Sequence, residues 1–335
     1  MKRRGFVSLA AGALVAWPIA LFAQRLGKVY RIAILRPSGT VGTWTEAASP
    51  GYWRPFFEEL RRLGYVEGQN LTVQRYSGAG ATDRYAELAR TVAASGPDVI
   101  FVTSARMAQF CKAATTTIPI VASTVDPVLV GLASSLAHPG GNITGVVADA
   151  GLEIEGKYLE LLRQLIPSAS RIAYLTPRAI WESNMLSPVR ELAQRLGVSV
   201  VAAALENPIG ETEYRRVFMD MAQQHVDAVI VGDSSENSTA SRLIIELAES
   251  YRLPALYTAR GYVEHGGLMS YGIVASELSR HAADAIGQVL GGADPGNIPF
   301  YRPTAFELVI NLKTAKALGL TVPQSILGRA DEVIE

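Results

Sequence analysis

The sequence predicts an α/β protein made of two similar doubly wound lobes, each built on a parallel sheet and joined to the other by crossover strands. Two observations predict this fold class. Short β-rich runs alternate with amphipathic helical stretches, which is the pattern of a parallel sheet with crossover helices. The same pattern then starts again in the second half of the chain, whose 335 residues are enough for two domains.

The first half supplies the strands and helices of one lobe. Runs rich in Val and Ile predict strands at residues 29–37, 70–76, 98–104 and 118–123. Amphipathic stretches between them predict helices at residues 52–64, 83–95 and 105–115. Gly64 and Gly96 stand where the glycine C-caps of two of these helices are expected.

Four segments of the first half recur in the same order about 130 to 140 residues later. The pairs are RIAILRP and RIAYLTP, RRLG and QRLG, DVIFVTS and DAVIVGDS, and TIPIVAST and RLPALYTA. One such pair is weak evidence for a repeat, because buried parallel strands are in general rich in Val and Ile. Four pairs in a constant order predict two similar α/β lobes within one chain.

Two glycine-rich segments, HPGGNITG at residues 138–145 and GGLMSYG at residues 266–272, each follow the last strand predicted for a half. Paired glycines let the chain turn through positive φ before a strand, so we interpret both as segments that cross between the lobes. A phosphate-binding loop is the alternative, but neither G-x-G-x-x-G nor G-x-x-x-x-G-K-[ST] occurs. The tripeptide at residues 142–144 matches a glycosylation sequon, which we interpret as structural.

Composition limits the classes of partner. The chain is 49% hydrophobic and 19% charged, with a formal net charge of +0, which is typical of a globular protein. Since no basic surplus is present to follow a phosphate backbone, we do not expect a nucleic-acid partner. The single cysteine, Cys111, lies in a predicted helix and is expected to be a small core residue.

The first residues predict an export signal. Lys2, Arg3 and Arg4 precede an apolar run at residues 7–23, which is shorter than the roughly 20 apolar residues that span a bilayer. We expect residues 1–23 to be a signal peptide, recognised by either the general or the twin-arginine route, and the mature protein to be periplasmic without membrane insertion. A retained N-terminal anchor is the alternative.

Several stretches carry a family resemblance. They are LGYVEGQNLTV from Leu63, ATTTIPIV from Ala114, DPVLVGLASSLAHPGGNITG from Asp126, GGLMSYG, and the long C-terminal segment FELVINLKTAKALGLTVPQSILGRADEVIE from Phe306. In these stretches the chain from about Arg31 onward resembles the periplasmic substrate-binding proteins of ABC transporters, most of all the family that includes the tryptophan/tyrosine-binding lipoproteins. It departs from that family in lacking the lipid-attachment cysteine, so we expect a freely soluble periplasmic protein.

The resemblance implies the type I periplasmic binding fold, with two Rossmann-like lobes, three crossovers and a ligand cleft between the lobes. In that plan lobe one takes residues 25–145 and 273–303, and lobe two takes residues 146–271 and 304–335. The implied function is that of the binding subunit of an ABC importer, with a membrane permease and an ATPase as partners and no cofactor. The implied ligand is an aromatic or branched amino acid, and a small aromatic acid or another carboxylate is the alternative.

Ligands of parallel α/β sheets bind beyond the carboxyl ends of the strands, and hydroxyl, amide and aromatic side chains gather at those ends here. Thr103 and Ser104 stand where a strand passes into a helix, so a ligand carboxylate would meet their hydroxyls and free backbone N–H groups. An ordinary N-cap is the compatible alternative for Ser104. The other polar candidates are Ser38, Ser123 and Asn184.

A ligand ammonium group would need an acidic partner, and aromatic rings would hold an apolar or aromatic side chain. The acidic candidates are Asp126, Asp233 and Glu236, of which we prefer Asp233, although each also suits a turn or a helix cap. The aromatic candidates are Trp44, Trp181, Tyr257 and Tyr271. We expect Trp181 to lie in a loop, and packing within a crossing segment is the alternative for Tyr271.

Catalysis is not expected. The histidines at positions 138, 225, 265 and 281 show no metal-ligand spacing, and neither G-x-S-x-G nor H-E-x-x-H occurs, so no catalytic residue and no metal site is predicted. Glu264 and His265 are the one adjacent acid–base pair, but neighbours in sequence usually point apart. A soluble sensor with the same fold is the remaining alternative class.

Overall fold

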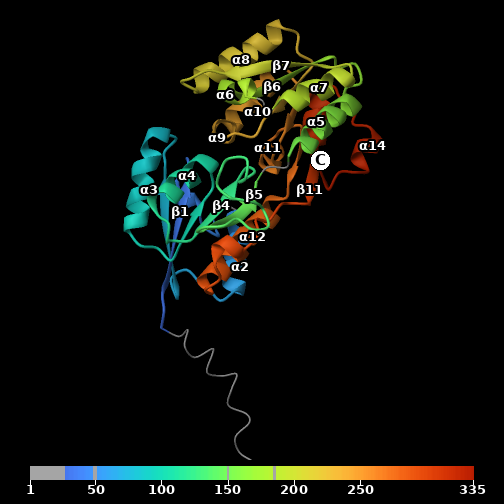
Figure 1. Cartoon of the computed structure of the whole chain (residues 1–335). Helices are drawn as coiled ribbons and strands as arrows, with labels where there is room; N and C mark the ends of the chain where they lie inside the picture. Colours follow the sequence, from blue (N-terminus) through green and yellow to red (C-terminus); the bar gives the residue numbers. More distant parts are fainter. Residues whose placement is uncertain (1–26, 48–50, 149–150, 184–185) are drawn as a thin grey trace, which may run out of the picture.

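The computed structural model describes residues 27–47, 51–148, 151–183 and 186–335, so the predicted signal peptide at residues 1–23 and Asn184 lie outside the described residues. Within them the chain forms two α/β lobes, one above the other in Figure 1. Each lobe has its own sheet with helices on both faces. The predicted fold class of two doubly wound lobes is therefore confirmed.

The lobe one sheet has five parallel strands in the order β2-β1-β3-β4-β5. They are β1 (Tyr30–Arg36), β2 (Leu71–Ser77), β3 (Val99–Val102), β4 (Ile120–Thr124) and β5 (Ile143–Val147). Helix α2 (Trp53–Arg62) and helix α12 (Ala275–Leu290) cover one face, and α12 returns to lobe one from the far end of the chain. Helices α3 (Tyr85–Ala94) and α4 (Ala105–Ala114) cover the other face.

The lobe two sheet has seven strands in the order β12-β11-β10-β9-β8-β6-β7. They are β6 (Arg171–Pro177), β7 (Ser199–Leu205), β8 (Ala228–Val231), β9 (Ala255–Tyr257), β10 (Met269–Ile273), β11 (Phe306–Asn311) and β12 (Glu332–Ile334). Strand β11 runs antiparallel to β10, and β12 runs parallel to β11. The C-terminal segment thus extends an otherwise parallel sheet in the reverse direction.

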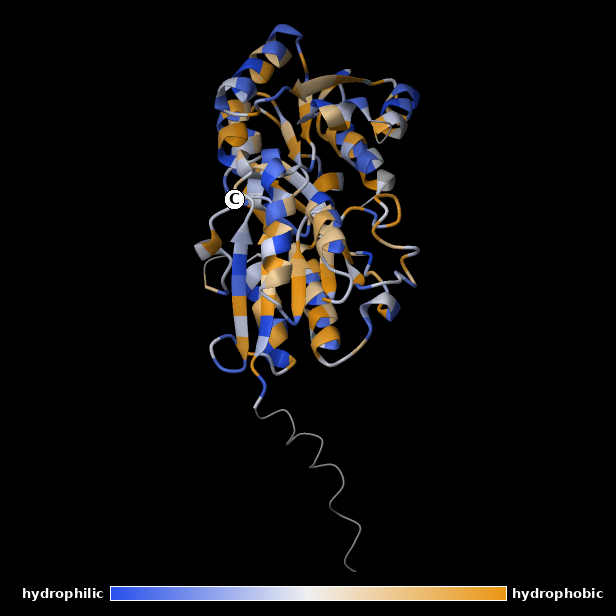
Figure 2. Ribbon diagram, turned by 60° about the vertical axis from the view of Figure 1, so that its left-hand side comes forward, coloured by the Kyte–Doolittle hydropathy of each residue, from blue (hydrophilic) through white to orange (hydrophobic). Residues whose placement is uncertain are grey.

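Helices on the two faces of this second sheet bury two further apolar layers. They are α5 (Leu152–Leu165), α6 (Arg178–Glu182), α7 (Ser187–Arg195), α8 (Glu211–Gln223), α9 (Ser235–Thr239), α10 (Ser241–Ser250), α11 (Arg260–Glu264), α13 (Leu312–Ala317) and α14 (Gln324–Leu327). Figure 2 shows apolar residues concentrated along the strands and on the helix faces turned toward them. None of the described helices is both long enough and apolar enough to cross a membrane.

The two Gly-Gly segments enter strands rather than crossing between the lobes, so our interpretation of them as crossings is wrong. HPGGNITG leads into β5 and GGLMSYG into β10, and both strands pair along their own sheets. Each segment ends in a glycine that a neighbouring strand approaches closely. A Cβ on Gly145 would lie 1.9 Å from the carbonyl oxygen of Ala122, and a Cβ on Gly272 would lie 2.0 Å from that of Thr258. Close backbone packing therefore explains why the pattern occurs twice.

The crossings follow directly after these strands. The chain leaves lobe one after β5 and leaves lobe two after β10, and it passes between the lobes a third time before β11. Strand β5 pairs with β4 as far as Val147, two residues beyond the limit expected from the sequence, and β10 extends to Ile273. We therefore propose that the lobes divide after these two residues.

The third crossing is fastened to lobe one. Tyr301 forms a parallel bridge with Val146 at the edge of the first sheet. Its hydroxyl donates to Glu277 of α12, and its ring stacks on His281 of the same helix. Residues as far as Tyr301 thus pack with lobe one before the chain enters β11.

The sequon residue and the lone cysteine both have structural surroundings. The Asn142 side chain donates hydrogen bonds of 3.0 and 2.8 Å to the carbonyl oxygens of Thr115 and Ile118, which ties the loop before β4 to the start of β5. Cys111 is buried in α4, and burial raises the pKa of its thiol to about 12. The thiol therefore stays protonated at neutral pH.

Candidate functional site

The carboxyl ends of the two sheets face one another across the space between the lobes (Figure 1). Ser38 follows β1 of lobe one and Thr239 ends α9 after β8 of lobe two, and their hydroxyl oxygens are 3.3 Å apart. A second observation links the same two lobes: burial, and after it the charge of Glu236 on α9, raises the pKa of Tyr85 on α3. Segments that follow strands of both sheets thus meet where the lobes adjoin.

The predicted hydroxyl groups of lobe one lie together at this edge. Ser104 is the N-cap of α4 and accepts a hydrogen bond of 3.4 Å from the backbone N–H of Met107. Thr103 precedes it, half-buried, and Ser123 is 7% exposed at the end of β4. Since strands β3 and β4 are neighbours, these three residues lie close together at the carboxyl edge of the lobe one sheet.

Asp126 is engaged within lobe one. Its Oδ1 accepts hydrogen bonds from the backbone N–H groups of Val128 and Leu129, at 2.9 and 3.2 Å, so it acts as the turn residue that the sequence left open. Its Oδ2 lies 3.7 Å from Arg302 in the third crossing. These contacts favour a role in fastening the crossing to the loop after β4.

Four residues that surround the end of β1 form a cluster, which we call the Arg36 cluster: Arg36, Trp44, Tyr52 and Trp53. Only Trp44 was among the predicted site residues. Its ring is 1% exposed and stacks on Trp53 with 6.4 Å between the ring centres, so its faces are used within lobe one. The guanidinium carbon of Arg36 lies 5.2 Å from the Trp44 ring centre and 5.7 Å from that of Trp53.

Two acidic groups of lobe two lie near Tyr174 of β6, one on the segment after β8 and one on α5. Asp233 follows β8 and is exposed. Glu155 in the first half of α5 was missed from the sequence; the Tyr174 hydroxyl donates to its Oε1 at 2.8 Å. Burial raises the pKa of Tyr174 strongly, and the charges of Glu155 and Asp233 add to that effect. Two carboxylates therefore stand near one buried phenol.

Two aromatic candidates of lobe two, Tyr257 and Tyr271, are held by packing. Tyr257 is 1% exposed and stacks on Tyr262 with 4.7 Å between ring centres. Tyr271 lies between Tyr158, in an edge-on contact, and Phe306, on which it stacks at 5.9 Å. These contacts agree with the alternative that Tyr271 packs near the crossing, and they place Tyr257 in the lobe two core.

Trp181 is on helix α6, so the expectation of a loop is wrong. The segment after β6 folds into a short helix in which Arg178 and Glu182 form an ion pair of 3.2 Å at i,i+4 spacing. The Arg190 guanidinium lies 5.0 Å from the centre of the half-buried Trp181 ring. The ring therefore already has a cationic partner in its own lobe.

Asn237 holds the helix that carries Thr239 to the cleft. Its fully buried side chain accepts a hydrogen bond from the Tyr214 hydroxyl at 3.0 Å and donates to the carbonyl oxygens of Leu175 and Gly232 at 3.0 and 2.8 Å. The strand ends of β6 and β8 are thus tied to the first turn of α9.

Replacing Asn237 by alanine is expected to lower the free energy of unfolding by about 2–4 kcal/mol, because three buried partners lose their hydrogen bonds at once. Urea unfolding followed by circular dichroism measures this. Asn297→Ala is the matched control, since the exposed Asn297 side chain donates only to Asp294. Equal losses for the two variants would contradict the bracing role of Asn237.

The described residues offer neither a metal cluster nor the acid–base pair considered from the sequence. No group of three or more His, Cys, Asp or Glu side chains among them is placed to hold a metal ion. Glu264 pairs with Arg260 at 2.7 Å, whereas the Nδ1 of His265 lies 2.6 Å from the carbonyl oxygen of Gly261. The two neighbours thus engage different partners.

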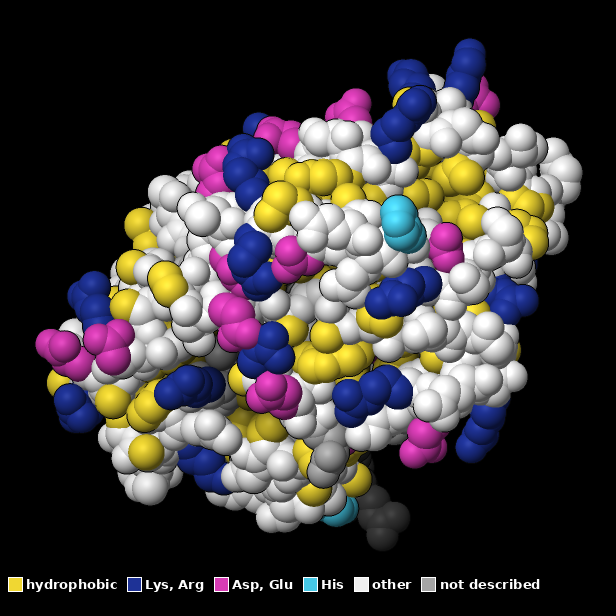
Figure 3. All heavy atoms as spheres, turned by 90° about the horizontal axis from the view of Figure 1, so that it is seen from above, with side chains coloured by type: hydrophobic (Ala, Val, Ile, Leu, Met, Phe, Trp, Pro, Cys, Tyr) yellow, Lys and Arg dark blue, Asp and Glu magenta, His cyan; other side chains and the backbone are white. Residues whose placement is uncertain are grey.

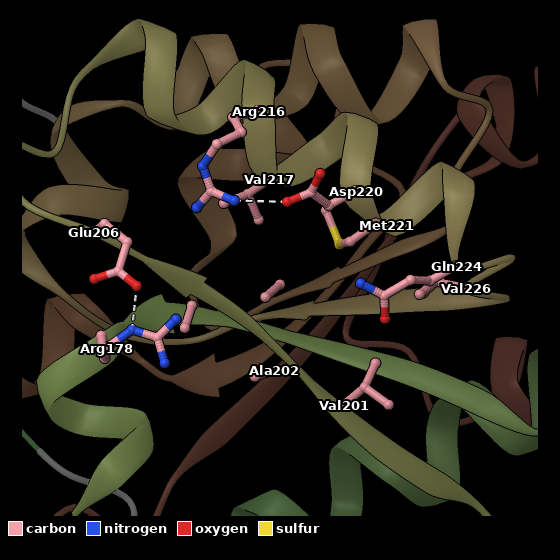
Figure 4. Close-up of a pocket in the computed structure, with 12 residues that line it drawn as sticks. Arg178, Val201, Ala202, Glu206, Arg216, Val217, Asp220, Met221, Gln224 and Val226 are labelled. Carbon is pink, nitrogen blue, oxygen red and sulfur yellow. Dashed lines mark hydrogen bonds and ion pairs between the residues drawn. The ribbon is translucent and has the colours of Figure 1, made fainter.

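Two further hollows lie within lobe two. The first, of about 270 Å³, lies between edge strand β7 and α8, where the ion pairs Arg178–Glu206 and Arg216–Asp220 cross its rim (Figure 4). The second, of about 460 Å³, lies beside Tyr257 between α10 and α13. Neither is lined by a lobe one residue, so neither is the cleft. Over the face of the molecule seen in Figure 3, basic and acidic side chains are mixed.

Comparison with known proteins agrees with this architecture. The family model for ABC transporter substrate binding proteins matches residues 53–334. The tyrosine-binding protein of Clostridioides difficile strain R20291 is 26% identical over 267 residues, which cover 79% of this chain and 75% of that protein.

Two solved structures share the fold. An ABC domain from Streptococcus pneumonia in complex with L-Trp superposes with a TM-score of 0.79 and 25% identity, over 91% of this chain and 99% of that one. The ligand-free, open structure of a substrate binding protein from Clostridium difficile gives a TM-score of 0.65 and 22% identity, over 91% of this chain and 99% of that one. Because the family match spans most of the sequence, the chain belongs to the ABC transporter substrate binding protein family.

Proposed function

We propose that this protein is the exported binding subunit of an ABC importer and takes an aromatic or branched amino acid into the cleft between its lobes. The observation that supports the proposal is the contact of Ser38 with Thr239, which brings together residues that follow strands of both sheets, where ligands of parallel α/β folds bind. The amino-acid class is supported by the relative named for tyrosine binding and by the neighbour that holds L-Trp.

Both walls offer groups that suit such a ligand. In lobe one, Ser38, Thr103, Ser104 and Ser123 would supply hydroxyls, and α4 would add free backbone N–H groups at its N-terminus. In lobe two, Asp233 remains our choice for the ligand ammonium, with Glu155 as the second carboxylate nearby. We assign Asp126, Tyr257 and Tyr271 to the support of the walls, because their contacts lie within their own lobes.

The mechanism is closure of the two lobes on the ligand. A solute bound by one lobe shifts the open–closed equilibrium only through contacts that it gains in the closed form, so lobe two must touch it after closure. The hydrogen-bond distance between Ser38 and Thr239, which lie on different lobes, supports a closed arrangement here. The closed form would then be recognised by a membrane permease with its ATPase, and binding needs no cofactor.

Export to the periplasm belongs to the same proposal. It is supported by family membership and by Lys2, Arg3 and Arg4 ahead of the apolar run that we predict to be a signal peptide. A binding protein for small aromatic acids is the alternative function, and the ammonium group separates the two. A true amino-acid site prefers L-Phe to 3-phenylpropionate, whereas an aromatic-acid site binds both.

A thermal-shift screen of the mature protein tests this function. We expect L-Trp, L-Tyr, L-Phe or a branched amino acid at 100 times its Kd to add about 2.7 kcal/mol, which raises the Tm by roughly 5–10 °C. D-Trp and free sugars serve as controls and should leave the Tm unchanged. A protein that responds to no amino acid but to sugars would contradict the proposed ligand class.

A further inference from the structure

The strongest unexplained feature of lobe one is the side chain of Arg36. It is the last residue of β1, directly after a run of fully buried residues, and its Nε is buried without a hydrogen-bond acceptor in the part of the chain that the structure describes. None of the described acidic side chains forms an ion pair with it, whereas Arg61, Arg62 and Arg75 of the same lobe all have carboxylate partners. An unpaired half-buried cation is costly unless something binds it.

The indole rings beside Arg36 do not meet this need. The guanidinium carbon of Arg36 lies over the rings of Trp44 and Trp53, and such contacts stabilise the cation electrostatically. The N–H donors of a guanidinium, however, lie in the plane of the group and point outward from its edge. The ring contacts therefore do not replace a hydrogen-bond acceptor, and the buried Nε–H remains available to a planar acceptor with two oxygens.

Two further polar groups of the Arg36 cluster are buried. The indole N–H of Trp44 has no hydrogen-bond partner among the described residues, and the Tyr52 hydroxyl interacts with the Ser123 hydroxyl at the end of β4. Burial raises the pKa of Tyr52 to about 12, while Arg36 and Ser123 act in the opposite direction, so the phenol is neutral and can donate. The Tyr52 hydroxyl, on which the Arg36 charge acts, therefore offers a further donor close to the guanidinium.

We propose that the Arg36 guanidinium is the seat of the ligand carboxylate, which it binds with two parallel hydrogen bonds while the hydroxyls of Tyr52 and Ser123 donate to the same group. This assignment rests on the proposed function and identifies the residue that binds the carboxylate group of the ligand. The seat offers one positive charge, because a guanidinium stays protonated at neutral pH even though burial lowers the pKa of Arg36. A planar monoanion such as a carboxylate matches it better than a phosphate dianion.

The test compares each ligand with its primary amide, which keeps the ammonium group and replaces the charged carboxylate by a neutral group. We would measure the Kd of L-Trp, L-Tyr and L-Leu and of their primary amides by isothermal titration calorimetry. The wild type is expected to bind the acid of the preferred pair roughly 100-fold more tightly than its amide, and Arg36→Gln to reduce that ratio to about threefold or less. Arg36→Lys keeps the charge without the paired donors and should give an intermediate ratio. Arg90→Gln, at an exposed arginine of α3, is the control and should keep the wild-type ratio.

Each outcome decides one of the two proposals. If the wild type binds none of these ligands, the proposed function fails. If it binds an acid and its amide equally, or if Arg36→Gln keeps the wild-type ratio, the function stands and the Arg36 seat is overturned. If Arg36→Gln does not fold, the ratio of the amide and acid Kd values in the wild type still shows whether a carboxylate charge is recognised. Arg36→Lys then shows whether Arg36 is the residue that recognises it.

Discussion

Replacing Gly145 by alanine is expected to unfold lobe one. The added Cβ would lie 1.9 Å from the carbonyl oxygen and 2.6 Å from the amide nitrogen of Ala122, which are backbone atoms of the neighbouring strand. Strand β4 cannot move aside, because it is paired with β3 on its other edge. We expect a loss of about 5 kcal/mol or more, which exceeds the effect of most single substitutions. Urea unfolding monitored by circular dichroism and by tryptophan fluorescence measures it.

Gly141→Ala is the matched control for this substitution. Gly141 lies in the same segment with a positive φ of 65°, but a Cβ there would meet nothing within 4 Å. Its replacement should cost only the conformational strain of about 1–2 kcal/mol. If Gly145→Ala proved as mild as Gly141→Ala, the close approach of β4 and β5 would be wrong.

A disulfide between positions 38 and 239 is expected to trap ligand in the cleft. The hydroxyl oxygens of Ser38 and Thr239 are 3.3 Å apart, so cysteines at these positions lie within reach of a bond between the lobes. Oxidation of the double variant Ser38→Cys/Thr239→Cys in the presence of ligand should slow ligand release at least about tenfold, because release requires the lobes to separate. Stopped-flow dilution into excess competitor, before and after reduction, gives the two rates.

Two controls separate trapping from chemical damage. The Ser38→Cys single variant has the same new thiol on lobe one but no partner on lobe two, so oxidant should leave its release rate unchanged. Cys111 does not interfere, since it is buried and its thiol pKa is raised to about 12. Unaltered release from the oxidised double variant would show that ligand leaves without opening this side of the cleft.

Local pattern predicted the lobes well because strand and helix periodicities are strong signals here. The echo of RIAILRP in RIAYLTP became β1 and β6, and each pairs in the same way with the next two strands of its sheet. The Gly-Gly segments were misread because a turn before a strand looks the same whether the strand stays in its sheet or crosses. The close contact between Gly145 and Ala122, which explains the glycine, joins two different strands and could not be predicted from the local pattern.

The site was only partly predictable, for the same physical reason. Topology alone places the positions after parallel strands at one edge of a sheet, and Ser38, which follows β1, lies beside Thr239 of the other lobe. The sequence alone did not show which strand-end residues would be buried by loops that are distant in the sequence. Arg36 looked like a polar strand end until the segment carrying Trp44 and Tyr52 folded over it. An arginine directly after a run of buried apolar residues is the signal that would have drawn attention to it.

Tyr257 shows the opposite error. A tyrosine at a strand end looks like a cleft residue, yet β9 lies in the middle of the seven-stranded sheet, and Tyr262 and Gly267 close over the ring. Glu155 was missed because it lies on the helix after the first crossing and not behind a strand. Its position beside Tyr174 depends on how the crossing segment places α5 against the lobe two sheet.

The central claim is that ligand draws the two lobes together, and the most direct measurement is the rate at which the 38–239 disulfide forms in the double variant. With mild oxidant, non-reducing electrophoresis or mass spectrometry follows the bond with and without saturating L-Trp, L-Tyr or the best ligand of the thermal screen. We predict that ligand accelerates bond formation severalfold, because it increases the population in which the two thiols meet. A rate that is the same with and without bound ligand would contradict closure as the mechanism.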